Sequence, residues 1–600
     1  MTHTADPSEA TATSEATAAS EATDASDPGR RAVLGGLAAA AALTAAQWTP
    51  LSRIPVGGAE ATVPPPPGPP PGIAIYQQSY RNWSGELRVD DLWTCAPATP
   101  ADVVILANWA KAHGWTLRAK GHSHNWSPIL VTADAGSADT LLVDTTQNLT
   151  SIAVQTGATP SVTAQAGVSM DVLLATLEAS GYGLTAVPAP GDITLGGVLA
   201  IDAHGTAVPA AGETRPYGHT YGSISNLVLS LTAVVWDAPT AQYKLRTFQR
   251  TDPAIAPLLA SLGRGFVVEA TLRVGQNQRL RCQSWMTVSA DDIFAPPATA
   301  GANSFASYVN QSGRVEVIWF PFTDNPWVKL WTVAPTKPPL SRQVTAPYNY
   351  PFSDFLPTEA ADLLGQIIAG NSGLTPAFCN LQGATSSAGL LATLSWDLWG
   401  WSKNTMLYIR PTTFRVTANG YAILTKRADI QRVVSEFHAY YKGALASYQA
   451  QGRFPMNGPL EVRVTGLDDP GHTGVAGAVH PTLSALRTRP DHPEWDVAVW
   501  LDILTTPGTP YSGQFYRETE QWVLANYSGS YAQVRVEWSK GWGYSGTAAW
   551  SDPTTVGTTV PDSFRSGLPA GNNWDTGVAA LDAYDPHRVF TNPFLDTLLT

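Results

Sequence analysis

One short stretch, Arg118-Ala-Lys-Gly-His-Ser-His-Asn-Trp-Ser-Pro128, concentrates residue types that bind anions and offer ring nitrogens. Gly121 stands before His122, Ser123 and His124. Small residues let consecutive backbone N–H groups point inward as an anion-binding nest, which suits a pyrophosphate. Two histidines also suggest zinc, but no cysteine pair or carboxylate stands at ligand spacing nearby. Taken alone, the loop is slightly more typical of an ordinary surface loop than of a site.

Two segments farther along place glycines between a strand and a helix. Residues 188–200 read PAPGDITLGGVLA and precede Asp202-Ala-His-Gly205, while residues 221–226 read YGSISN. Each motif is weak alone, but three in this order over about a hundred residues form a specific signal. Their order resembles the flavoprotein family typified by vanillyl-alcohol oxidase, in which a GxxHS-like loop, a PGxxxxGG loop and a GxxSxN segment surround one FAD.

The resemblance extends along the globular chain to one group of that family, the bacterial cholesterol oxidases that bind FAD covalently. Five stretches carry the closer match: residues 316–323, 399–403, 457–463, 537–542 and 585–592. The resemblance implies an α+β protein with a two-domain, vanillyl-alcohol oxidase-type (PCMH-like) architecture. An FAD-binding domain would be followed by a substrate domain, in which helices cover one face of a large antiparallel sheet.

Hydrophobic periodicity and capping residues predict the elements around these motifs. A helix over residues 100–113 takes Thr99 as its N-cap and ends at Gly114. A second helix over residues 171–180 takes Ser169 as its cap. In the second half we predict strands over residues 315–322, 328–333, 406–412, 460–465, 497–504 and 532–538, and helices over residues 428–448 and 516–527.

The resemblance also implies which residues hold the cofactor. Counting a GxxH pattern from Gly121 identifies His124 as the histidine that bonds the flavin 8α-methyl group, although the residues alone leave His122 an equal candidate. A covalent imidazole link raises the flavin redox potential and favours substrate oxidation. Some of the glycines are equally typical of ordinary turns. The residues expected around the FAD are Arg118, Lys120, Gly121, His122, Ser123, His124, Asn125, Pro190, Gly191, Thr194, Gly196, Gly197, His204, Gly205, Gly222, Ser223, Asn226, Val268 and Asn592.

Charged residues also lie in or beside otherwise apolar strands of the second half. Oxidation of a secondary alcohol needs an acceptor for the hydroxyl proton and cations near the developing charge. Any one such residue is more typical of a structural ion pair, because a buried carboxylate is costly unless it is paired. Asp502 departs from the family, which has an amide there, so it is either a better base or a partner for Lys540. The six candidates are Glu316, Glu461, Arg463, Asp502, Glu537 and Lys540.

Resemblance assigns these residues to two tasks. Glu461 and Arg463 stand two apart on one strand and therefore share a face. In the covalent cholesterol oxidases the residues matching Glu461, Arg463 and Glu316 move together and gate a hydrophobic oxygen tunnel. Those matching Glu537 and Lys540 lie in the polar part of the active site. We therefore predict a mobile pair of Glu461 and Arg463, with Glu316 as a second carboxylate able to receive the arginine.

Size and composition exclude several other classes of protein. Six hundred residues exceed one ordinary core, and 44% hydrophobic residues with 21 tryptophans supply ample apolar surface to bury. The net charge of −12 and the lack of a basic run after residue 31 argue against nucleic-acid binding. The three cysteines, Cys95, Cys282 and Cys379, are too few and too widely spaced for a disulfide framework or a metal site.

The first residues indicate export. Residues 1–29 lack bulky side chains and should be disordered. Arg30 and Arg31 then precede a short apolar run, which resembles a twin-arginine signal more than a chance arginine pair. The run is too short to span a membrane. We predict a signal region over residues 1–50, a Pro-rich linker over 51–75, an FAD-binding domain over 76–274, a substrate domain over 275–545 and a return to the FAD-binding domain over 546–600.

Together these features predict a secreted sterol oxidase with covalent FAD. It would oxidise the 3β-hydroxyl of cholesterol to a ketone, reduce dioxygen to hydrogen peroxide and move the Δ5 double bond to Δ4, giving cholest-4-en-3-one. Trp399 and Trp401 are candidates for the wall of the sterol pocket. Sterol and dioxygen are the expected partners, with transient contact to sterol-bearing membranes or lipid aggregates. No nucleic acid, metal ion or protein partner is expected.

Two other functions stay open at this point. The same flavin chemistry on another alcohol, a sugar or a lactone would favour an open groove rich in Asp, Arg and Tyr. The Trp-rich, weakly charged second half argues against such a groove. A cell-surface binding protein that kept the fold without flavin is the alternative from another class, and a flavin spectrum excludes it.

Overall fold

The structure is a computed structural model that describes residues 64–136, 139–354, 358–529 and 531–600. The described residues form one compact unit. The predicted signal region and most of the predicted linker lie outside the described residues. In the described part of the chain, no helix is long and apolar enough to cross a membrane, and Cys95, Cys282 and Cys379 are buried free thiols.

Two small sheets form the half that carries the predicted FAD motifs, which we call the flavin-binding half. The strand order is β1-β2-β4-β3 in the first sheet and β5-β6-β10-β8-β9 in the second. In the first sheet β4 is parallel to both β2 and β3, whereas the second sheet is antiparallel throughout. The strands are β1 (Ile75–Arg81), β2 (Arg88–Cys95), β3 (Thr116–Lys120), β4 (Thr140–Asp144), β5 (Ile152–Gln155), β6 (Ser161–Gln165), β8 (Val228–Asp237), β9 (Gln242–Gln249) and β10 (Phe266–Arg273).

Helices α2 (Pro100–His113), α3 (Met170–Ala179) and α4 (Leu195–Ala200) lie between these strands. The prediction for α2 is confirmed, because Thr99 and Asp102 form a capping box and Gly114 adopts a φ of 73°. Ser169 is the N-cap residue of α3, as predicted, but its side chain makes no capping hydrogen bond. The Ser169 hydroxyl donates to the Asp171 carboxylate instead of accepting from the helix N-terminus.

A nine-stranded sheet dominates the other half, which corresponds to the predicted substrate domain and which we call the substrate half; the strand order is β15-β16-β12-β14-β13-β18-β19-β17-β20. Every pairing is antiparallel except that of β15 with β16. The strands are β12 (Arg279–Trp285), β13 (Arg314–Trp319), β14 (Trp327–Val333), β15 (Arg342–Gln343), β16 (Asp397–Trp401), β17 (Thr417–Thr425), β18 (Leu460–Gly466), β19 (Val497–Thr505) and β20 (Ala532–Val536). The expected large antiparallel sheet is confirmed.

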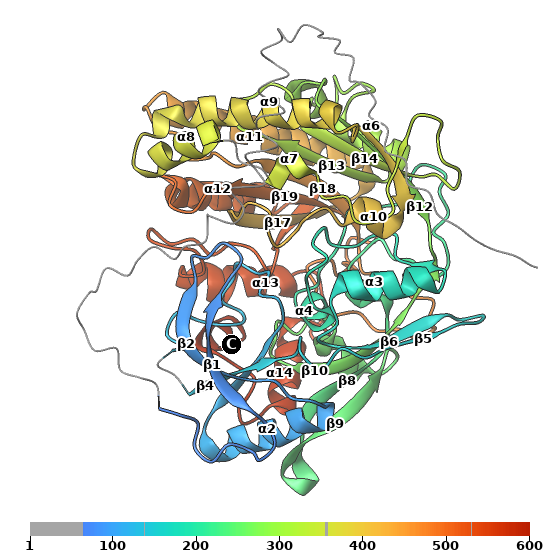
Figure 1. Cartoon of the computed structure of the whole chain (residues 1–600), viewed down its shortest axis with the longest axis vertical. Helices are drawn as coiled ribbons and strands as arrows, with labels where there is room; N and C mark the ends of the chain where they lie inside the picture. The colour runs from blue at the N-terminus through green and yellow to red at the C-terminus, as the bar shows by residue number, and fades with distance from the viewer. Residues whose placement is uncertain (1–63, 137–138, 355–357, 530) are drawn as a thin grey trace, which may run out of the picture. The chain divides into compact units, whose positions relative to one another are not determined.

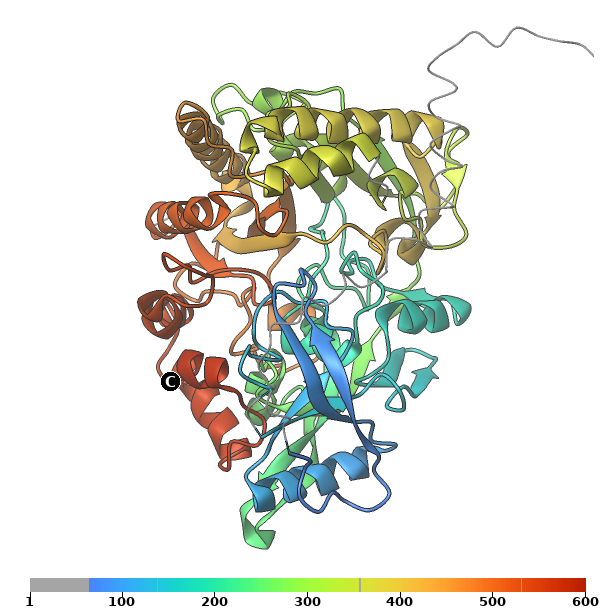
Figure 2. The ribbon, with the colours of Figure 1, turned by 60° about the vertical axis from the view of Figure 1, so that its left-hand side comes forward.

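Helices cover one face of this sheet, and the flavin-binding half faces the other, as Figure 1 and the turned view in Figure 2 show. The helix layer packs through aromatic contacts, such as Tyr440 stacked on Trp522 at 4.3 Å. The covering helices are α6 (Phe305–Ser312), α8 (Thr358–Ile368), α9 (Thr375–Ala392), α11 (Ile430–Gln449) and α12 (Ser512–Asn526).

One predicted strand, over residues 406–412, is absent. Helix α10 (Ser402–Met406) occupies its start, and the chain beyond is irregular. The backbone N–H groups of Tyr408 and Ile409 both donate to the carbonyl of Ala189, at 3.2 and 3.4 Å, rather than to a sheet neighbour. This segment therefore joins the substrate half to the predicted flavin motif over residues 188–200.

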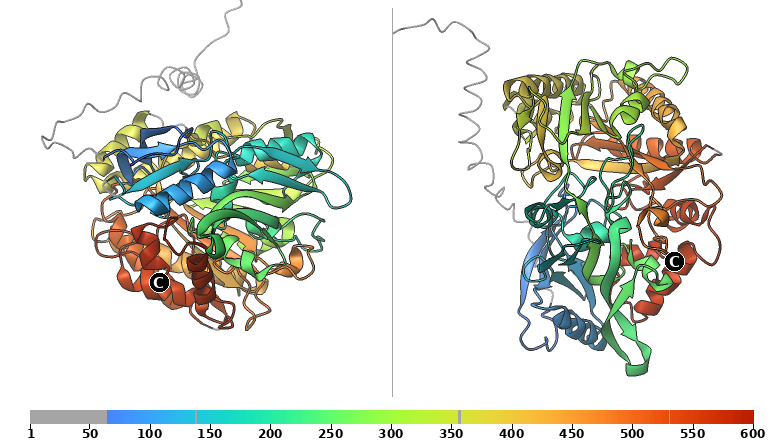
Figure 3. Two further views of the ribbon diagram at one scale, coloured as in Figure 1. Left: turned by 90° about the horizontal axis from the view of Figure 1, so that it is seen from below. Right: turned by 90° about the vertical axis from the view of Figure 1, so that its right-hand side faces the viewer.

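The C-terminal residues return to the flavin-binding half through α14 (Trp574–Tyr584) and α15 (Pro593–Leu598), which Figure 3 shows beside its strands. Asp585, which caps the end of α14, accepts from Arg264 at 2.5 Å and from Tyr243. These contacts are buried, so the last residues are an integral part of that half.

Candidate functional site

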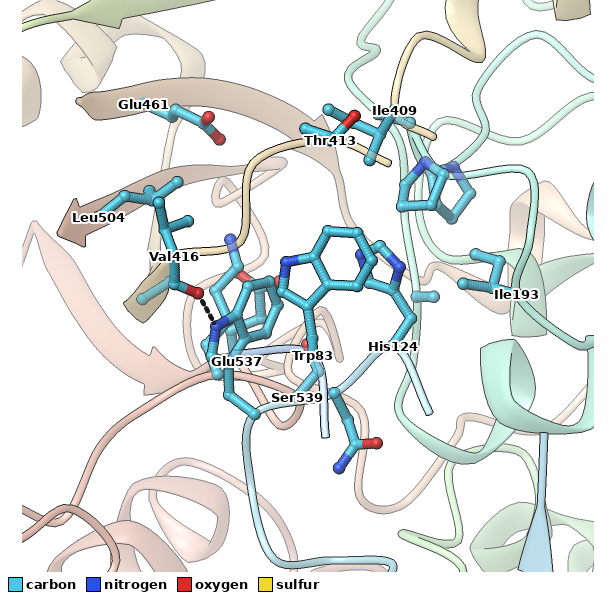
Figure 4. Close-up of a pocket in the computed structure, with 18 of the residues that line it drawn as sticks. Trp83, His124, Ile193, Ile409, Thr413, Val416, Glu461, Leu504, Glu537 and Ser539 are labelled. Carbon is cyan, nitrogen blue, oxygen red and sulfur yellow. Dashed lines mark hydrogen bonds and ion pairs between the residues drawn. The ribbon is translucent and has the colours of Figure 1, made fainter. Parts of the chain in front are cut away.

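A cavity of about 410 Å³ lies between the two halves. The flavin-binding half contributes most residues of two segments to its walls, one between residues 118 and 130 and the other between residues 188 and 204. The substrate half contributes strands β13, β14, β18 and β19, helices α8 and α9, α7 (Pro351–Asp354) and residues 408–418. Figure 4 shows His124 and Trp83 at one side and Glu461 and Leu504 on the strands opposite.

The loop after β3 is shaped for close approach of a ligand. A Cβ on Gly121 would lie 2.3 Å from the Thr194 hydroxyl, so only glycine fits there. Ser123 adopts a φ of 59°, in the left-handed region that turns the backbone sharply. Thr194 caps α4 by accepting from the Gly197 N–H. Small residues from two motifs thus form one narrow cradle.

His124 presents a neutral imidazole in this cradle. Its ring stacks on Trp83, with centroids 3.8 Å apart, and meets the edge of Trp126 at 6.1 Å. Burial, followed by the positive charge of Arg415, lowers the pKa of His124 to about 3. Its Nδ1 is buried and has no hydrogen-bond partner among the described residues. An unpaired ring nitrogen beside the narrow cradle fits the predicted flavin, whereas His122 is exposed.

About half of the predicted cofactor residues line the cavity. They are Arg118, Gly121, His122, Ser123, His124, Asn125, Pro190, Thr194, Gly197 and His204. The others lie outside its walls and are Lys120, Gly191, Gly196, Gly205, Gly222, Ser223, Asn226, Val268 and Asn592.

Several of these residues hold the protein together instead of facing a ligand. The Arg118 guanidinium donates to four backbone carbonyls, those of residues 129, 130, 263 and 590, so it is not free for a pyrophosphate. Lys120 pairs with Asp144 at 2.9 Å. Asn592 donates to the carbonyls of residues 128 and 129 and so supports the histidine loop from behind.

Others in this group belong to the buried packing of the flavin-binding half. Gly196 packs against Ala166, and a Cβ on Gly205 would lie 2.5 Å from the Val187 nitrogen. Ser223 and the backbone beside Gly222 are held by Asp468. Asn226 donates to the carbonyl of residue 469, Gly191 packs against Asp171, and Val268 is a core residue of β10. Sequence motifs identify such positions without separating ligand contact from support.

The cavity face of the large sheet carries two rows of charged and polar residues. Strand register places Lys329, Glu316 and Arg463 opposite one another on β14, β13 and β18. The neighbouring row runs from Glu461 on β18 to Asp502 on β19 and then to Gly420 on β17.

Gly420 leaves room for the charged side chains that extend over it. A Cβ there would lie 2.7 Å from both the Asp502 carboxylate and the Lys540 side chain, and 2.8 Å from the Glu537 carboxylate. Glu537 and Lys540 come from the segment after β20 and complete the row at its flavin side.

Asp502 is the ion-pair partner of two cations. Lys540 lies 2.7 Å from its Oδ2, and Arg463 pairs with the same oxygen. Lys540 also lies 3.1 Å from Glu537. The expected pair of Glu461 and Arg463 is absent, because Arg463 crosses to Asp502 on the next strand. Of the two roles left open for Asp502, the geometry supports ion pairing.

Three buried acids of the site differ in pKa, with one far below neutrality and two near it. Burial alone would raise the pKa of Asp502, but Lys540 and Arg463 outweigh it and lower that pKa to about 2. Burial and then the charge of Asp502 raise the pKa of Glu537 to about 7. Burial raises the pKa of Glu461 to about 7 as well, against the opposing effect of Arg463. The site thus combines one permanent carboxylate with two acids that titrate near neutrality, a pattern typical of acid–base sites.

His204, one of the predicted cofactor residues, also lies beside these acids. Its ring stacks on Trp500 at 3.7 Å, and its Nδ1 lies 3.0 Å from the Gly205 carbonyl. A carbonyl only accepts, so Nδ1 carries the proton and Nε2 keeps its lone pair. Nε2 lies 4.0 Å from the Glu537 carboxylate. Burial, followed by Arg463, lowers the pKa of His204 to about 3, so the ring is neutral.

Sequence reasoning missed Trp83, Lys329, Tyr408 and Trp500 in the walls of the cavity. For one of these four residues the sequence offers a signal. Lys329 is a charged residue within the apolar strand Trp327–Val333, and the same kind of pattern identified Glu316. The predicted role of Trp399 and Trp401 is wrong. Neither lines the cavity, and both stack on Arg279 with centroid distances of 4.7 and 4.4 Å. Among the described residues, no group of three or more His, Cys, Asp or Glu side chains is placed to hold a metal ion.

Comparison with known proteins matches both halves of the chain. The family described as "Cholesterol oxidase, substrate-binding" matches residues 279–600, and the FAD binding domain family matches residues 93–238. A solved "Solvent-stable cholesterol oxidase" is 58% identical with a TM-score of 0.88, covering 90% of this chain and all of that one. The cholesterol oxidase from B. sterolicum is 46% identical in sequence, and a histidine-to-alanine mutant from Brevibacterium sterolicum is 45% identical. Both have a TM-score of 0.88 and the same coverage of the two chains. No curated protein matches.

Proposed function

The chain belongs to the cholesterol oxidase family of FAD-dependent enzymes, and we propose that this sterol oxidase converts cholesterol to cholest-4-en-3-one with release of hydrogen peroxide. One observation carries the proposal. A single cavity joins the His124 cradle to the row of acids and cations on the large sheet. Its substrate side includes Ile318, Phe320 and Leu504, which suit a fused hydrocarbon ring system better than a sugar.

The residues divide the chemistry between them. A bound FAD would supply the acceptor for the hydride of the alcohol carbon and the carrier of its electrons to dioxygen. His124 would hold it through a bond to the 8α-methyl group, because its ring is neutral and its Nδ1 has no hydrogen-bond partner among the described residues. Glu537 takes the hydroxyl proton, with His204 as the adjacent acceptor, and its pKa of about 7 suits a base at neutral pH. Lys540 and Arg463 stabilise the developing negative charge on oxygen.

A quantitative assay of peroxide and of the conjugated ketone with cholesterol tests this function. We expect the two products in equal amounts, and a Δ5-3-ketone should not accumulate. Release of peroxide with a sugar or lactone, but not with cholesterol, would support the other alcohol oxidases instead. A colourless protein without flavin would support the binding protein.

Glu461 and Arg463 also provide a basis for control of dioxygen access. We propose that Arg463 has a second position on Glu316, besides the position on Asp502 seen here. Exchange between two positions of a charged side chain can open and close an apolar path. Glu461 lines the cavity two residues away, and no ion pair holds it among the described residues.

Glu461→Gln should therefore slow reoxidation of the reduced enzyme by dioxygen by about tenfold, equal to about 1.4 kcal/mol in barrier. Reduction by sterol should slow less. Stopped-flow spectroscopy measures the two half-reactions separately. Slower reduction with unchanged reoxidation would assign Glu461 to substrate oxidation or to structure instead.

We also propose that the enzyme takes its sterol from a lipid surface. Helix α9 carries no charged residue over its 18 residues, and its inner face lines the cavity. At its C-terminal end Leu391 and Leu394 are 67% and 63% exposed, and Leu340, 81% exposed, and Trp396 accompany them. Arg342 donates to the carbonyl of residue 393 and so holds the Leu340 loop against this end of α9. We call these four apolar side chains the α9 patch.

Replacing Leu391 and Leu394 of the α9 patch with aspartate should reduce co-sedimentation with cholesterol-containing vesicles, because two charges would enter the lipid interface. Turnover of detergent-solubilised cholesterol should be unchanged. Leu245→Asp, at another exposed leucine on β9 (40% exposed), is the matched control. Equal loss of vesicle binding in the control would contradict the proposal that the α9 patch contacts the lipid surface.

Export through the twin-arginine route remains a proposal from sequence alone, since Arg30 and Arg31 lie outside the described residues. Replacing both with lysine should keep the enzyme inside the cell, because the route reads the arginine pair. Immunoblots of medium and cell extract measure the distribution. Unchanged secretion would contradict the proposal.

A further inference from the structure

Lys329 is a buried cation with no part in the reaction described above. Its side chain has no exposed surface, and its Nζ has no hydrogen-bond partner among the described residues. The ammonium lies 3.1 Å from the ring centroid of Tyr408, 4.5 Å from that of Tyr350 and 4.6 Å from that of Trp327. Aromatic faces attract a cation without accepting a conventional hydrogen bond. These rings, which we call the aromatic box, fix one positive charge in the cavity wall.

Glu316 is the carboxylate that this charge balances. It stands opposite Lys329 in the strand register, and their charged atoms are 3.6 Å apart. The Tyr408 hydroxyl donates to both Glu316 oxygens, at 2.6 Å each. Tyr408 therefore contributes its ring to the aromatic box and its hydroxyl to the acid, which ties Lys329 and Glu316 into one unit.

Arg463 stands on the other side of Glu316, directly opposite it in the register of β13 and β18, yet it pairs with Asp502. A hollow of about 20 Å³, lined by Glu316, Arg463, Tyr408 and His204, lies next to the main cavity. It is large enough for one water molecule. Glu316 and Arg463 are thus neighbours without an ion pair, because Lys329 already compensates the acid.

We propose that Lys329 is a positioning residue: by neutralising Glu316 it favours the position of Arg463 on Asp502 over the second position on Glu316, and so favours a positive charge beside the reacting hydroxyl. Without Lys329, Glu316 becomes a buried carboxylate with no cation, which is strongly unfavourable. Arg463 is the cation that can reach it across one strand pairing. The effect on the reaction rests on the proposed function, whereas the effect on the position of Arg463 does not.

Crystal structures and rapid kinetics of two holoenzyme variants test the proposal. In Lys329→Met, which keeps an unbranched side chain in the aromatic box, we expect Arg463 to contact Glu316. Reduction by cholesterol should slow at least about tenfold. In the double variant Lys329→Met with Glu316→Gln, no uncompensated acid remains. Arg463 should return to Asp502, and the rate should recover to within about threefold of wild type.

The double variant separates positioning from packing. If Lys329→Met does not fold but the double variant folds with Arg463 on Asp502, charge compensation is supported. If Arg463 stays on Asp502 in Lys329→Met, or if the double variant is unfolded or as slow as the single one, the proposal is overturned. Wild-type enzyme that cholesterol fails to reduce would contradict the proposed function, and the position of Arg463 would still decide the role of Lys329.

Discussion

We expect flavin reduction by cholesterol to slow by about 10²–10⁴-fold when Glu537 is replaced by glutamine, because the hydroxyl proton would then have no carboxylate to accept it. Glutamine keeps the shape of the side chain, and Lys540 stays paired with Asp502 at 2.7 Å. Fold and flavin content should therefore be preserved. Anaerobic stopped-flow mixing with sterol measures the reduction rate.

Glu520 offers the matched control, because it is another buried glutamate with a raised pKa, caused mainly by burial. It accepts from Tyr421 at 3.0 Å and from the backbone N–H groups of residues 543 and 544, and it does not line the cavity. Glu520→Gln should lower stability without slowing reduction. Equal slowing in both variants would show that Glu537 acts only through structure.

The pH dependence of the reduction rate tests the same role of Glu537 as the base. The base must be ionised, so the rate should fall as the pH drops below about 7, the pKa of Glu537. After burial, the negative charge of Asp502 is the largest cause that raises this pKa. Asp502→Asn removes that charge and leaves Lys540 to Glu537 alone, so the acid limb should move to lower pH. A limb that moves to higher pH, or stays in place, would contradict the assignment of the base.

His124→Ala should yield an enzyme that binds FAD without a covalent bond. The cradle of Gly121, Ser123 and Thr194 remains, so the cofactor still binds, but no neutral ring nitrogen is left beside it. Without the proposed covalent link the flavin redox potential should be lower, and activity should fall by about one to two orders of magnitude, or about 1.4–2.8 kcal/mol in barrier. Flavin fluorescence on a denaturing gel measures the covalent fraction.

His122→Ala is the control for the choice between the two histidines. His122 is exposed, whereas His124 is stacked on Trp83 with an unpaired Nδ1. The His122 variant should keep its fluorescent band. If it loses the band while the His124 variant keeps it, the assignment is reversed.

Strand periodicity predicts part of the site well. Alternate residues of a strand share a face, which places Glu461 beside Arg463, and apolar neighbours indicate that Glu316 and Asp502 need partners. The choice of partner is not predictable from periodicity. Arg463 stands near three acids on three adjacent strands, and cations from β14 and from the segment after β20 decide which acid it pairs with. That balance exists only in the folded sheet.

The motifs predict which segments form the cofactor loop, but not the role of every side chain in them. Gly121 to Asn125 line the cavity, as the spacing of the GxxHS-like loop indicates. Arg118 comes from the same stretch and also lines the cavity, but four backbone carbonyls occupy its guanidinium. His204 follows a glycine motif, yet its place against Trp500 and Glu537 depends on how the large sheet docks on the loop. A motif fixes the path of the backbone, and tertiary contacts fix the task of each side chain.

The central claim is that one cavity brings a sterol hydroxyl to an enzyme-bound flavin. Anaerobic addition of cholesterol to the purified holoenzyme tests it most directly, with the visible flavin spectrum as the readout. We predict bleaching of the flavin with one 3-keto steroid formed per flavin, and return of the oxidised spectrum with release of hydrogen peroxide when dioxygen is admitted. A flavin that stays oxidised with cholesterol but is bleached by a sugar or a lactone would contradict this account.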